Sequence, residues 1–247
     1  MRFWISGILV LYSWGVYAQS ETSPICGTIA TQEQINFISS FSKNNKSFVG
    51  KTQSSIVVLP IKAHIVRQSN GQGGLSIEAL NSAIEKVNGF YQNSNMRFEL
   101  FGDVNFIDDD EFYDFNAQDE GKIGVPNDVS KVINVYFFNS ATSQGTPLCG
   151  YTRFPPSEDR VIMVSSCTTQ GNTFAHELGH YFTLYHTHGK TNTGTTDELV
   201  DGSISTVAGD DICDTPADPN LSGQVNGNCQ YVGTARDANG DFFNPVV

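Results

Sequence analysis

Two histidines one helical turn apart, with a glutamate directly after the first, constrain this chain more than any other feature. The string HELGHYFTLYH at residues 176–186 contains His176, Glu177 and His180, and His186 follows six positions after His180. On a helix, residues i and i+4 lie on one face, so the first two imidazoles can bind one zinc ion. A third imidazole leaves one coordination position open, as catalytic zinc sites do. The pattern predicts a zinc site with Glu177 as general base on a metal-bound water.

The third histidine can reach the same ion only if the chain leaves the helix after His180. A straight helix would separate His176 and His186 by about 15 Å, whereas zinc–nitrogen bonds are about 2.0–2.1 Å long. We therefore expect the chain to turn back between His180 and His186. Thr183 lies in this stretch, and a β-branched residue with positive φ costs roughly 1–3 kcal/mol. Three alternatives are open: Thr183 adopts a negative φ, Leu184 makes the turn instead, or Thr183 has a positive φ and is strained. The alternative third ligand is His188.

The N-terminal residues 1–18 have the pattern of a secretory signal peptide. Arg2 precedes an apolar run from Ile5 to Val16, and a small-residue cleavage site ends at Ala18. The run is too short to cross a bilayer, and no other stretch is long enough, so we expect a secreted, extracellular protein without a membrane span. The net charge of −12 argues against binding nucleic acid, which requires a basic patch.

Export favours disulfides, and five cysteines leave one thiol unpaired. Proximity in sequence favours the pairs Cys149–Cys167 and Cys213–Cys229, one arrangement among fifteen. Cys26 is then the unpaired cysteine. Its alternative is a disulfide with a later cysteine or with another molecule.

Polar residues 19–54 suit a pro-segment, with a short helical patch around Ile35 and Ile38 and a cleavable basic loop near Lys43 or Lys46. The compact domain should then occupy residues 55–247. Apolar patterns predict strands at 56–66, 96–100, 132–138 and 160–165, and His64 is expected to be a strand residue without a catalytic role. A helix capped by Ser76 should carry its apolar stripe to residue 91, and the zinc helix should begin at residue 172 or 173.

Beyond the zinc motif the chain becomes acidic and rich in glycine. Carboxylates on flexible loops suit calcium, which takes roughly six to eight oxygen ligands, although no EF-hand spacing is present. The alternative is a solvated acidic loop. The candidate calcium ligands are Asp197, Asp201, Asp210, Asp211 and Asp214.

Taken together, these motifs resemble those of the metzincin zinc metalloproteases, in particular the pappalysin/cytophagalysin-like family. The resemblance runs from about residue 56 to the end and rests on TFAHELGH at 173–180, LYHT at 184–187 and DICDTP at 211–216. It implies an α/β (α+β) catalytic domain with a twisted, mostly parallel sheet, an antiparallel edge strand and two long helices, the second bearing the zinc site. It also implies hydrolysis of internal bonds in protein or peptide substrates, and calcium in the loops after the motif. The implied zinc ligands are His176, His180 and His186, with Glu177 as base.

Two further roles follow from this resemblance. Several metzincin zymogens are kept latent by a pro-segment cysteine on the zinc ion, and Cys26 is the candidate for that role. In metzincins the strand before the zinc helix lies at the sheet edge, where a substrate can add as another strand. The alternative is an ordinary buried strand. The residues expected on this shelf are Val161, Ile162, Met163 and Val164.

The chain departs from the family pattern in two places. Thr183 stands where the family has glycine, and no methionine follows His186, although metzincins carry a methionine turn there. The missing methionine predicts that the chain is truncated and that its C-terminal subdomain is incomplete. Separately, we expect the protein to be a monomer. Three other interpretations are a secreted binding module with zinc but impaired catalysis, a zincin whose third ligand is Glu198 or Asp201, and a calcium-stabilised adhesion domain.

Overall fold

A mixed sheet, organised around the long strand β2 (Val57–Arg67), forms the framework of the structure, a computed structural model that describes residues 25–44, 55–170, 172–190 and 196–245. The expected signal peptide, Lys46 and the end of the expected pro-segment lie outside these residues. Nine strands belong to the sheet in the described part of the chain. Their order is β3 (Met96–Leu100), β2, β6 (Ile133–Phe138), β9 (Arg160–Val164), β8 (Thr146–Thr152), β7 (Ser140–Ser143) and β5 (Asp114–Asn116).

The sheet is mostly parallel, and β8 is the exception. It runs antiparallel to β9 and β7, whereas the remaining strand pairs are parallel. Two short strands add to this order: β4 (Asn105–Asp108) pairs with β2, and β1 (Ile25–Cys26) pairs with β8. The expected α/β architecture is confirmed.

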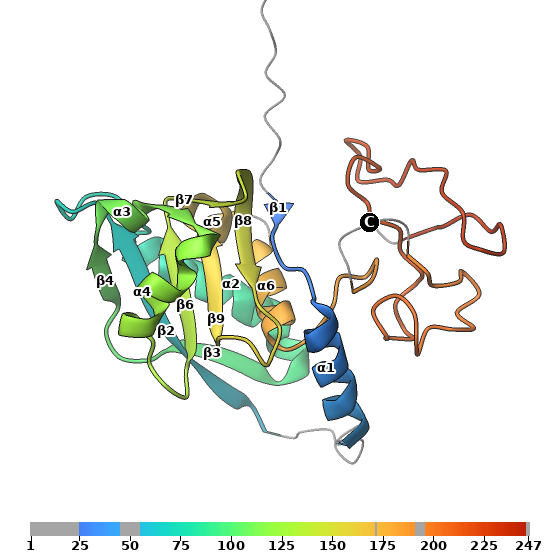
Figure 1. Cartoon of the computed structure of the whole chain (residues 1–247), viewed down its shortest axis with the longest axis horizontal. Coiled ribbons are helices and arrows are strands. Elements are labelled where there is room, and N and C mark those ends of the chain that lie inside the picture. The colour runs from blue at the N-terminus through green and yellow to red at the C-terminus, as the bar shows by residue number, and fades with distance from the viewer. Residues whose placement is uncertain (1–24, 45–54, 171, 191–195, 246–247) are drawn as a thin grey trace, which may run out of the picture.

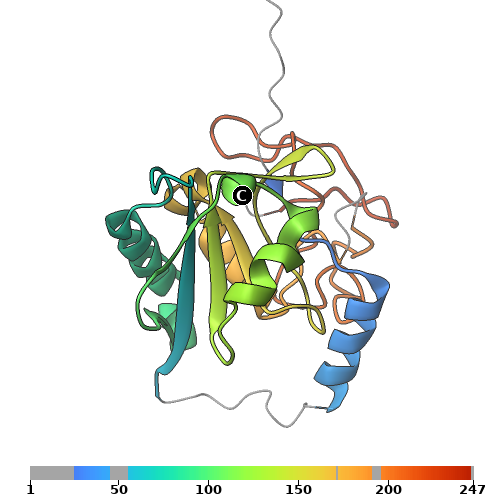
Figure 2. The same ribbon diagram turned by 60° about the vertical axis from the view of Figure 1, so that its left-hand side comes forward.

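Helices cover both faces of the sheet (Figure 1). On one face, α2 (Ile77–Tyr91) and α6 (Thr173–Tyr181) pack on β2, β6 and β9. On the other lie α4 (Glu120–Asn127) and the short helix α3 (Asp110–Tyr113), most clearly separated from α2 in the second view (Figure 2). The single-turn helices are η2 (Gln92–Ser94), η3 (Ala117–Asp119) and α5 (Ser165–Thr169).

Local signals explain where α2 begins and which side it buries. The hydroxyl of Ser76 accepts a hydrogen bond from the backbone N–H of Ala79, as an N-cap should. Leu80, Ile84 and Val87 recur at helical spacing and are buried against the sheet. The strands at 57–67, 96–100, 133–138 and 160–164 likewise lie where the apolar pattern predicts them.

The expectation that residues Val161 to Val164 form an exposed substrate shelf is wrong. Strand β9 lies between β6 and β8, and all five of its residues are buried. A continuous apolar run without polar alternation is typical of a strand covered on both faces. The strand that lies further towards the edge is β8, which the sequence pattern did not reveal.

Behind β8, on the face covered by α4, a buried network of charged groups joins helix to sheet. Arg160, only 4 % exposed on its side chain, forms ion pairs with Glu120 at 3.5 Å and Asp128 at 2.7 Å. Glu120 also accepts hydrogen bonds from the Tyr151 hydroxyl and the Arg153 guanidinium. These contacts tie β8 and β9 to α4.

His64, expected to be a structural strand residue, is completely buried in β2. Its ring stacks on Tyr136 with centroids 4.2 Å apart and contacts the side-chain amides of Asn134 and Asn105. Burial lowers the pKa of His64, so this ring is neutral at pH 7.

The disulfide Cys149–Cys167 is present and joins β8 to α5. The second expected pair is absent, because Cys213 and Cys229 both carry exposed free thiols. Cys229 lies in the tight turn of a small hairpin, with φ of 56°, where the bridge Val225–Tyr231 fixes its position separately from that of Cys213. Cys26 is also free.

The segment before β2 crosses the domain as a short strand and a helix. Strand β1 lies parallel to β8, with Ile25 opposite Leu148 and Cys26 opposite Gly150. Helix α1 (Gln32–Asn44) follows and projects beyond the sheet (Figure 1). Residues 196–245 contain turns and isolated bridges but no helix or named strand. Throughout the described residues, no helix is long and apolar enough to cross a membrane.

Candidate active site

The zinc-motif helix α6 ends where the third histidine requires it to end. The N–H of Leu184 bonds to the carbonyl of Gly179 at 3.0 Å, and the N–H of Thr183 bonds to that of His180 at 2.8 Å. This pair of bonds is a Schellman motif, which terminates a helix with one residue in the left-handed region. Thr183 is that residue, with φ of 72°. Of the three possibilities for the turn, the structure has strain at Thr183 itself, at a cost of roughly 1–2 kcal/mol.

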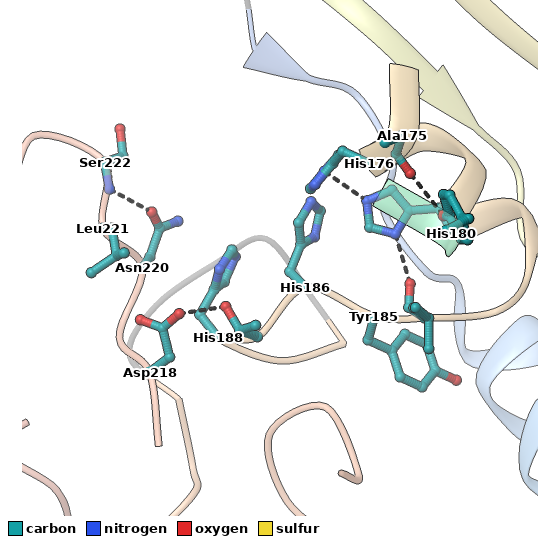
Figure 3. A pocket seen from close by; sticks show the side chains of 14 residues that line it. Ala175, His176, His180, Tyr185, His186, His188, Asp218, Asn220, Leu221 and Ser222 are labelled. Atoms are coloured by element: carbon teal, nitrogen blue, oxygen red, sulfur yellow. Dashed lines mark hydrogen bonds between the residues drawn. The ribbon is translucent and has the colours of Figure 1, made fainter. Parts of the chain in front are cut away.

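The turn brings three imidazoles together. The ring centroids of His176 and His180 lie 4.5 Å apart, those of His180 and His186 also 4.5 Å, and those of His176 and His186 5.3 Å. Figure 3 shows the three rings turned toward one another at the wall of a pocket. A hydrogen bond of 2.7 Å between Nδ1 of His180 and the carbonyl of Leu184 directs the Nε2 atom of His180 into the cluster.

The cluster contains a fourth donor from the other end of the chain. Sγ of Cys26 lies 3.6 Å from Nε2 of His180, and the ligand atoms of Cys26 and the three histidines all lie within 4.8 Å of one another. The structure thus brings the sequence-predicted residues His176, His180, His186 and Cys26 into one group. His188 stacks on His186 at 4.9 Å and is not part of this group, and neither are Glu198 and Asp201.

These four side chains fit a zinc ion. Bonds of about 2.0–2.1 Å to nitrogen and 2.3 Å to sulfur give a tetrahedron with edges of roughly 3.3–3.6 Å. The distance from Cys26 Sγ to His180 Nε2 is 3.6 Å, and that between the Nε2 atoms of His176 and His180 is 3.0 Å. These two edges of the cluster are therefore close to the lengths that zinc requires, one within the range and one slightly shorter.

The protonation of the cluster also suits a cation. Burial and the neighbouring imidazoles lower the pKa of His180 to about 4 and that of His186 to about 3, so both rings are neutral, as metal ligands must be. Burial, together with the negative charge of Glu177, raises the pKa of the Cys26 thiol. A bound metal cation would instead lower the pKa of the Cys26 thiol.

Glu177 lies beneath the cluster and is completely buried. Burial raises the pKa of Glu177 to about 7. Strand β8 passes directly over it at Gly150, where a β-carbon would lie 3.1 Å from Cγ of Glu177 and 2.8 Å from the carbonyl oxygen of Ile162. Only glycine allows this close approach of strand to helix. One carboxylate oxygen, Oε1, is buried and has no hydrogen-bond partner.

The other carboxylate oxygen of Glu177 contacts the segment that follows Cys26. The hydroxyl of Thr28 donates a hydrogen bond of 3.0 Å to Oε2 of Glu177 and accepts one of 2.9 Å from the backbone N–H of Thr152. Residues 26–28 therefore contact three features of the site. Cys26 reaches the histidine cluster and pairs with the edge of β8, and Thr28 bonds to the Glu177 carboxylate and to β8. Sequence reasoning did not identify Thr28, because no motif surrounds it.

A cavity of about 460 Å³ opens beside the cluster. Its lining includes His176, His180 and His186 on one side and Asp218 with residues 220–222 on the other (Figure 3), and Tyr91 also lines it. The hydroxyl of Tyr91 donates to the carbonyl of Ala175 at 2.9 Å and so joins α2 to α6 at the base of the site.

The five aspartates predicted to bind calcium do not converge. Asp201 and Asp214 are exposed, and Asp211 forms an ion pair with Lys190 at 2.6 Å. Asp197 accepts a hydrogen bond from the N–H of Gly209, and Asp210 from the N–H of Ile212. Each of these aspartates has a different partner, and their spacing in the sequence could not predict this because the loops have no regular geometry.

Two other carboxylates, Glu198 and Asp218, interact electrostatically with this acidic region of the chain. Glu198 is 1 % exposed, and Oε2 of Glu198 and Oδ1 of the buried Asp218 have no hydrogen-bond partner. Burial and the negative charges of Asp210, Asp197 and Asp218 raise the pKa of Glu198. Neither Glu198 nor Asp218 was among the predicted calcium ligands.

A mixed sheet, a helix with His-Glu-x-x-His and a third histidine after a tight turn are features that this chain shares with metzincin-type zinc metalloproteases. Comparisons with known proteins agree with this class. Residues 77–187 match the reprolysin-like metallopeptidase family M12B. The expected resemblance to metzincin zinc metalloproteases is thus confirmed, although the family model that matches is the reprolysin-like one.

The chain is also similar to individual proteins. An extracellular metalloprotease of the fungus Colletotrichum graminicola is 25% identical over 185 residues, which cover 66% of this chain and 64% of the relative. The chain therefore spans less than two thirds of the length of that relative. A promirolysin mutant of Tannerella forsythia shares the fold, with a TM-score of 0.55 and 19% identity over 78% of this chain and 76% of the other.

Proposed function

We propose that this chain is a secreted, zinc-dependent endopeptidase in which Glu177 is the general base. The observation that carries the proposal is the convergence of three neutral imidazoles directly above a buried carboxylate. His176, His180 and His186 would hold the ion. The name of the fungal relative, an extracellular metalloprotease, supports both the activity and the export.

The chain's own residues account for the proton transfers of peptide hydrolysis. When bound, zinc supplies a Lewis acid that polarises the scissile carbonyl and lowers the pKa of water to about 7. Glu177 accepts the proton of the attacking water on its carboxylate and passes it to the leaving amine nitrogen. The low exposure of Glu177 keeps bulk water away from this proton.

Substitution of the base tests this function. Glu177→Gln should retain zinc, since the three imidazoles are unchanged, but should reduce cleavage of a quenched fluorescent peptide by at least about 100-fold. The matched control is Glu85→Gln, at an exposed carboxylate on α2. Zinc content by elemental analysis and cleavage with and without chelator are measured on the same samples. Full activity in Glu177→Gln would refute the assignment.

We further propose β8, rather than β9, as the strand that aligns the substrate. Its residues 150–152 pair with β9 on one side, and their other side faces β1 and Thr28. An extended peptide can therefore add to the edge that the N-terminal segment now covers. The backbone N–H of Thr152, which bonds to Thr28, is a donor available to such a peptide.

We also propose that residues 19–54 are a pro-segment that keeps the site latent, with Cys26 as the ligand of the fourth zinc position. The cluster geometry supports this role, and the free thiol of Cys26 argues against the alternative disulfide. Zinc-loaded Cys26→Ser should cleave peptide faster than the unaltered chain. The matched control is Cys213→Ser, which removes an exposed free thiol elsewhere.

Thiol titration gives an independent measure of the same contact. In a chain carrying Cys213→Ser and Cys229→Ser, Cys26 is the single free thiol. Zinc should protect it from a thiol reagent, and chelator should restore its reactivity. Protection that persists in chelator would eliminate the proposed zinc–thiolate bond.

Calcium is the second metal that we propose. The site would consist of Glu198, Asp210, Asp218 and Asp197, because two of these carboxylates are buried with an oxygen that has no partner. Calcium prefers several carboxylate oxygens on flexible loops. Burial and mutual repulsion raise the pKa of Glu198, Asp210 and Asp218, and a bound cation would lower these pKa values again.

A further inference from the structure

A small apolar cluster lies between the N-terminal segment and the zinc-binding residues. Phe154 is 2 % exposed, and Ala30 and Tyr185 are also buried in this cluster. Ile35 and Ile38 of α1 pack against it from outside. Three of these five residues therefore belong to the proposed pro-segment and two to the domain that it covers.

The domain part of this cluster directly adjoins a zinc-binding side chain. The ring of Phe154 lies 5.6 Å from that of His180 and 5.2 Å from that of Tyr185, centroid to centroid. Tyr185 immediately precedes His186 in the chain. Phe154 itself follows the end of β8, along the edge proposed to align the substrate.

The N-terminal segment follows this edge like an extended peptide. Ile25 and Cys26 pair with β8, Thr28 bonds to Thr152, and Ala30 then packs on Phe154. Gln34, almost fully buried, holds the following helix in place by donating to the carbonyl of Phe154 at 2.8 Å and to the hydroxyl of Ser157 at 2.9 Å. The chain itself thus shows which kind of side chain this surface accepts.

We propose that Phe154 and Tyr185 form a specificity subsite that takes an apolar side chain of the substrate once the N-terminal segment has left. This inference rests on the proposed endopeptidase function and adds a substrate preference to it. When the N-terminal segment leaves, Ile35 and Ile38 leave this surface together with Ala30. The space that opens is therefore larger than an alanine side chain. Leucine or phenylalanine is therefore the expected occupant, within about three residues of the scissile bond, since an extended chain advances about 3.3 Å per residue.

The test uses peptides that differ at one position only, carrying leucine, phenylalanine, serine or aspartate. The protein is the full zinc-loaded chain with Cys26→Ser, which loosens the N-terminal segment. Cleavage is measured as kcat/KM, and affinity for the same peptides is measured by fluorescence polarisation in the same chain with Glu177→Gln added. At one position near the scissile bond, the apolar peptides should exceed the polar ones roughly 10- to 100-fold in both measurements.

Variants then assign the preference to this surface. Phe154→Ser should reduce the ratio between leucine and serine peptides at least about tenfold, whereas Phe101→Ser, at a half-exposed phenylalanine after β3, should leave it unchanged. Phe154→Leu keeps an apolar side chain with less risk to folding and should retain the preference. A preference that is the same in all three variants would overturn the inference.

The two measurements separate this inference from the function on which it rests. Equal cleavage and equal binding of the four peptides would overturn the subsite and leave the hydrolytic function standing. Tighter binding of the apolar peptides without any cleavage would support the subsite and refute hydrolysis. Neither cleavage nor selective binding would refute both.

Discussion

The hydroxyl of Thr28 donates to the carboxylate of Glu177 across a separation of 149 residues in the chain. The hydroxyl oxygen of Thr28 also accepts a hydrogen bond from the backbone N–H of Thr152. The side chain of Thr28 therefore joins the proposed pro-segment to both the proposed base and the proposed substrate strand. Thr28 thus places a hydroxyl at the carboxylate proposed to accept a proton from water. The proposed latency would then depend on two contacts, the sulfur of Cys26 at the candidate metal ligands and the hydroxyl oxygen of Thr28 at the candidate base.

Loss of the Thr28 hydroxyl should weaken latency in a way that loss of its methyl group does not. Thr28→Val leaves both Thr152 N–H and Oε2 of Glu177 without this partner, at a cost of about 1.5–3 kcal/mol for a hydrogen bond to a charged group. In the Cys26→Ser background, peptide cleavage by the uncut chain should therefore rise about tenfold or more. Thr28→Ser, which keeps the hydroxyl, serves as control. Equal latency of the valine and serine variants would contradict this role.

Thr183→Gly should stabilise the domain. Thr183 has φ of 72°, a conformation that costs a residue with a β-carbon roughly 1–2 kcal/mol and costs glycine nothing. Part of the gain is offset by the greater freedom of glycine in the unfolded chain, so we expect a net increase of about 0.5–1 kcal/mol. Urea denaturation measures it, with Thr173→Gly, at the first residue of α6, as a control that should destabilise. If Thr183→Gly instead lowers the free energy of unfolding, the turn is not strained and the prediction is wrong.

Arg160→Met should destabilise the fold strongly. The substitution leaves Glu120 as a buried carboxylate with one fewer cation and removes the cationic partner of Asp128, which keeps its hydrogen bond from the Tyr136 hydroxyl. Breaking one side of a buried ion pair costs about 3–5 kcal/mol. Arg97→Met, in an exposed pair with Glu99, should change the free energy of unfolding by less than about 1 kcal/mol. Similar effects of the two substitutions would show that the network behind β8 contributes little.

The acidic group around Glu198 predicts a stability that depends on pH and calcium. The pKa values of Glu198, Asp210 and Asp218 are raised, so these groups bind protons more tightly in the folded chain. Their contribution is therefore fully present below the unfolded values near pH 4 and is lost as the pH rises through the raised values. Calcium should raise Tm at pH 7 and have little effect at pH 4.

The same experiment separates Glu198 from the other carboxylates nearby. Glu198→Gln should raise Tm at pH 7 without calcium and abolish most of the calcium response. Asp214→Asn, at an exposed aspartate, should preserve that response. Identical melting curves with and without calcium at pH 7 would rule out the proposed site.

The elements with strong local signals could be predicted from the sequence. Ser76 marks the start of α2, and apolar runs mark β2, β3, β6 and β9. Strand β8 could not, because its sequence TPLCGYT contains proline and glycine, which disfavour strands. Its strand conformation depends on pairing with residues distant in sequence.

The candidate site shows the same division. The three histidines of the cluster were predicted because zinc requires particular residue types, and the helix sets the spacing of two of them. Cys26 was predicted through the resemblance to metzincin zymogens. The separate locations of Asp201, Asp211 and Asp214 depend on loops without a repeating geometry, so their side-chain partners could not be derived. Thr28, Phe154 and Tyr185 are ordinary residues that gain a role only through tertiary contacts.

The attachment of β1 and α1 to the domain through the same chain has a kinetic consequence. While the chain is intact, these segments face β8 at the high effective concentration of an intramolecular partner. A cut between α1 and β2 would make the same contacts bimolecular without changing any of them. The cut protein should therefore regain activity on dilution, and the released segment should act as a concentration-dependent inhibitor of neighbouring molecules.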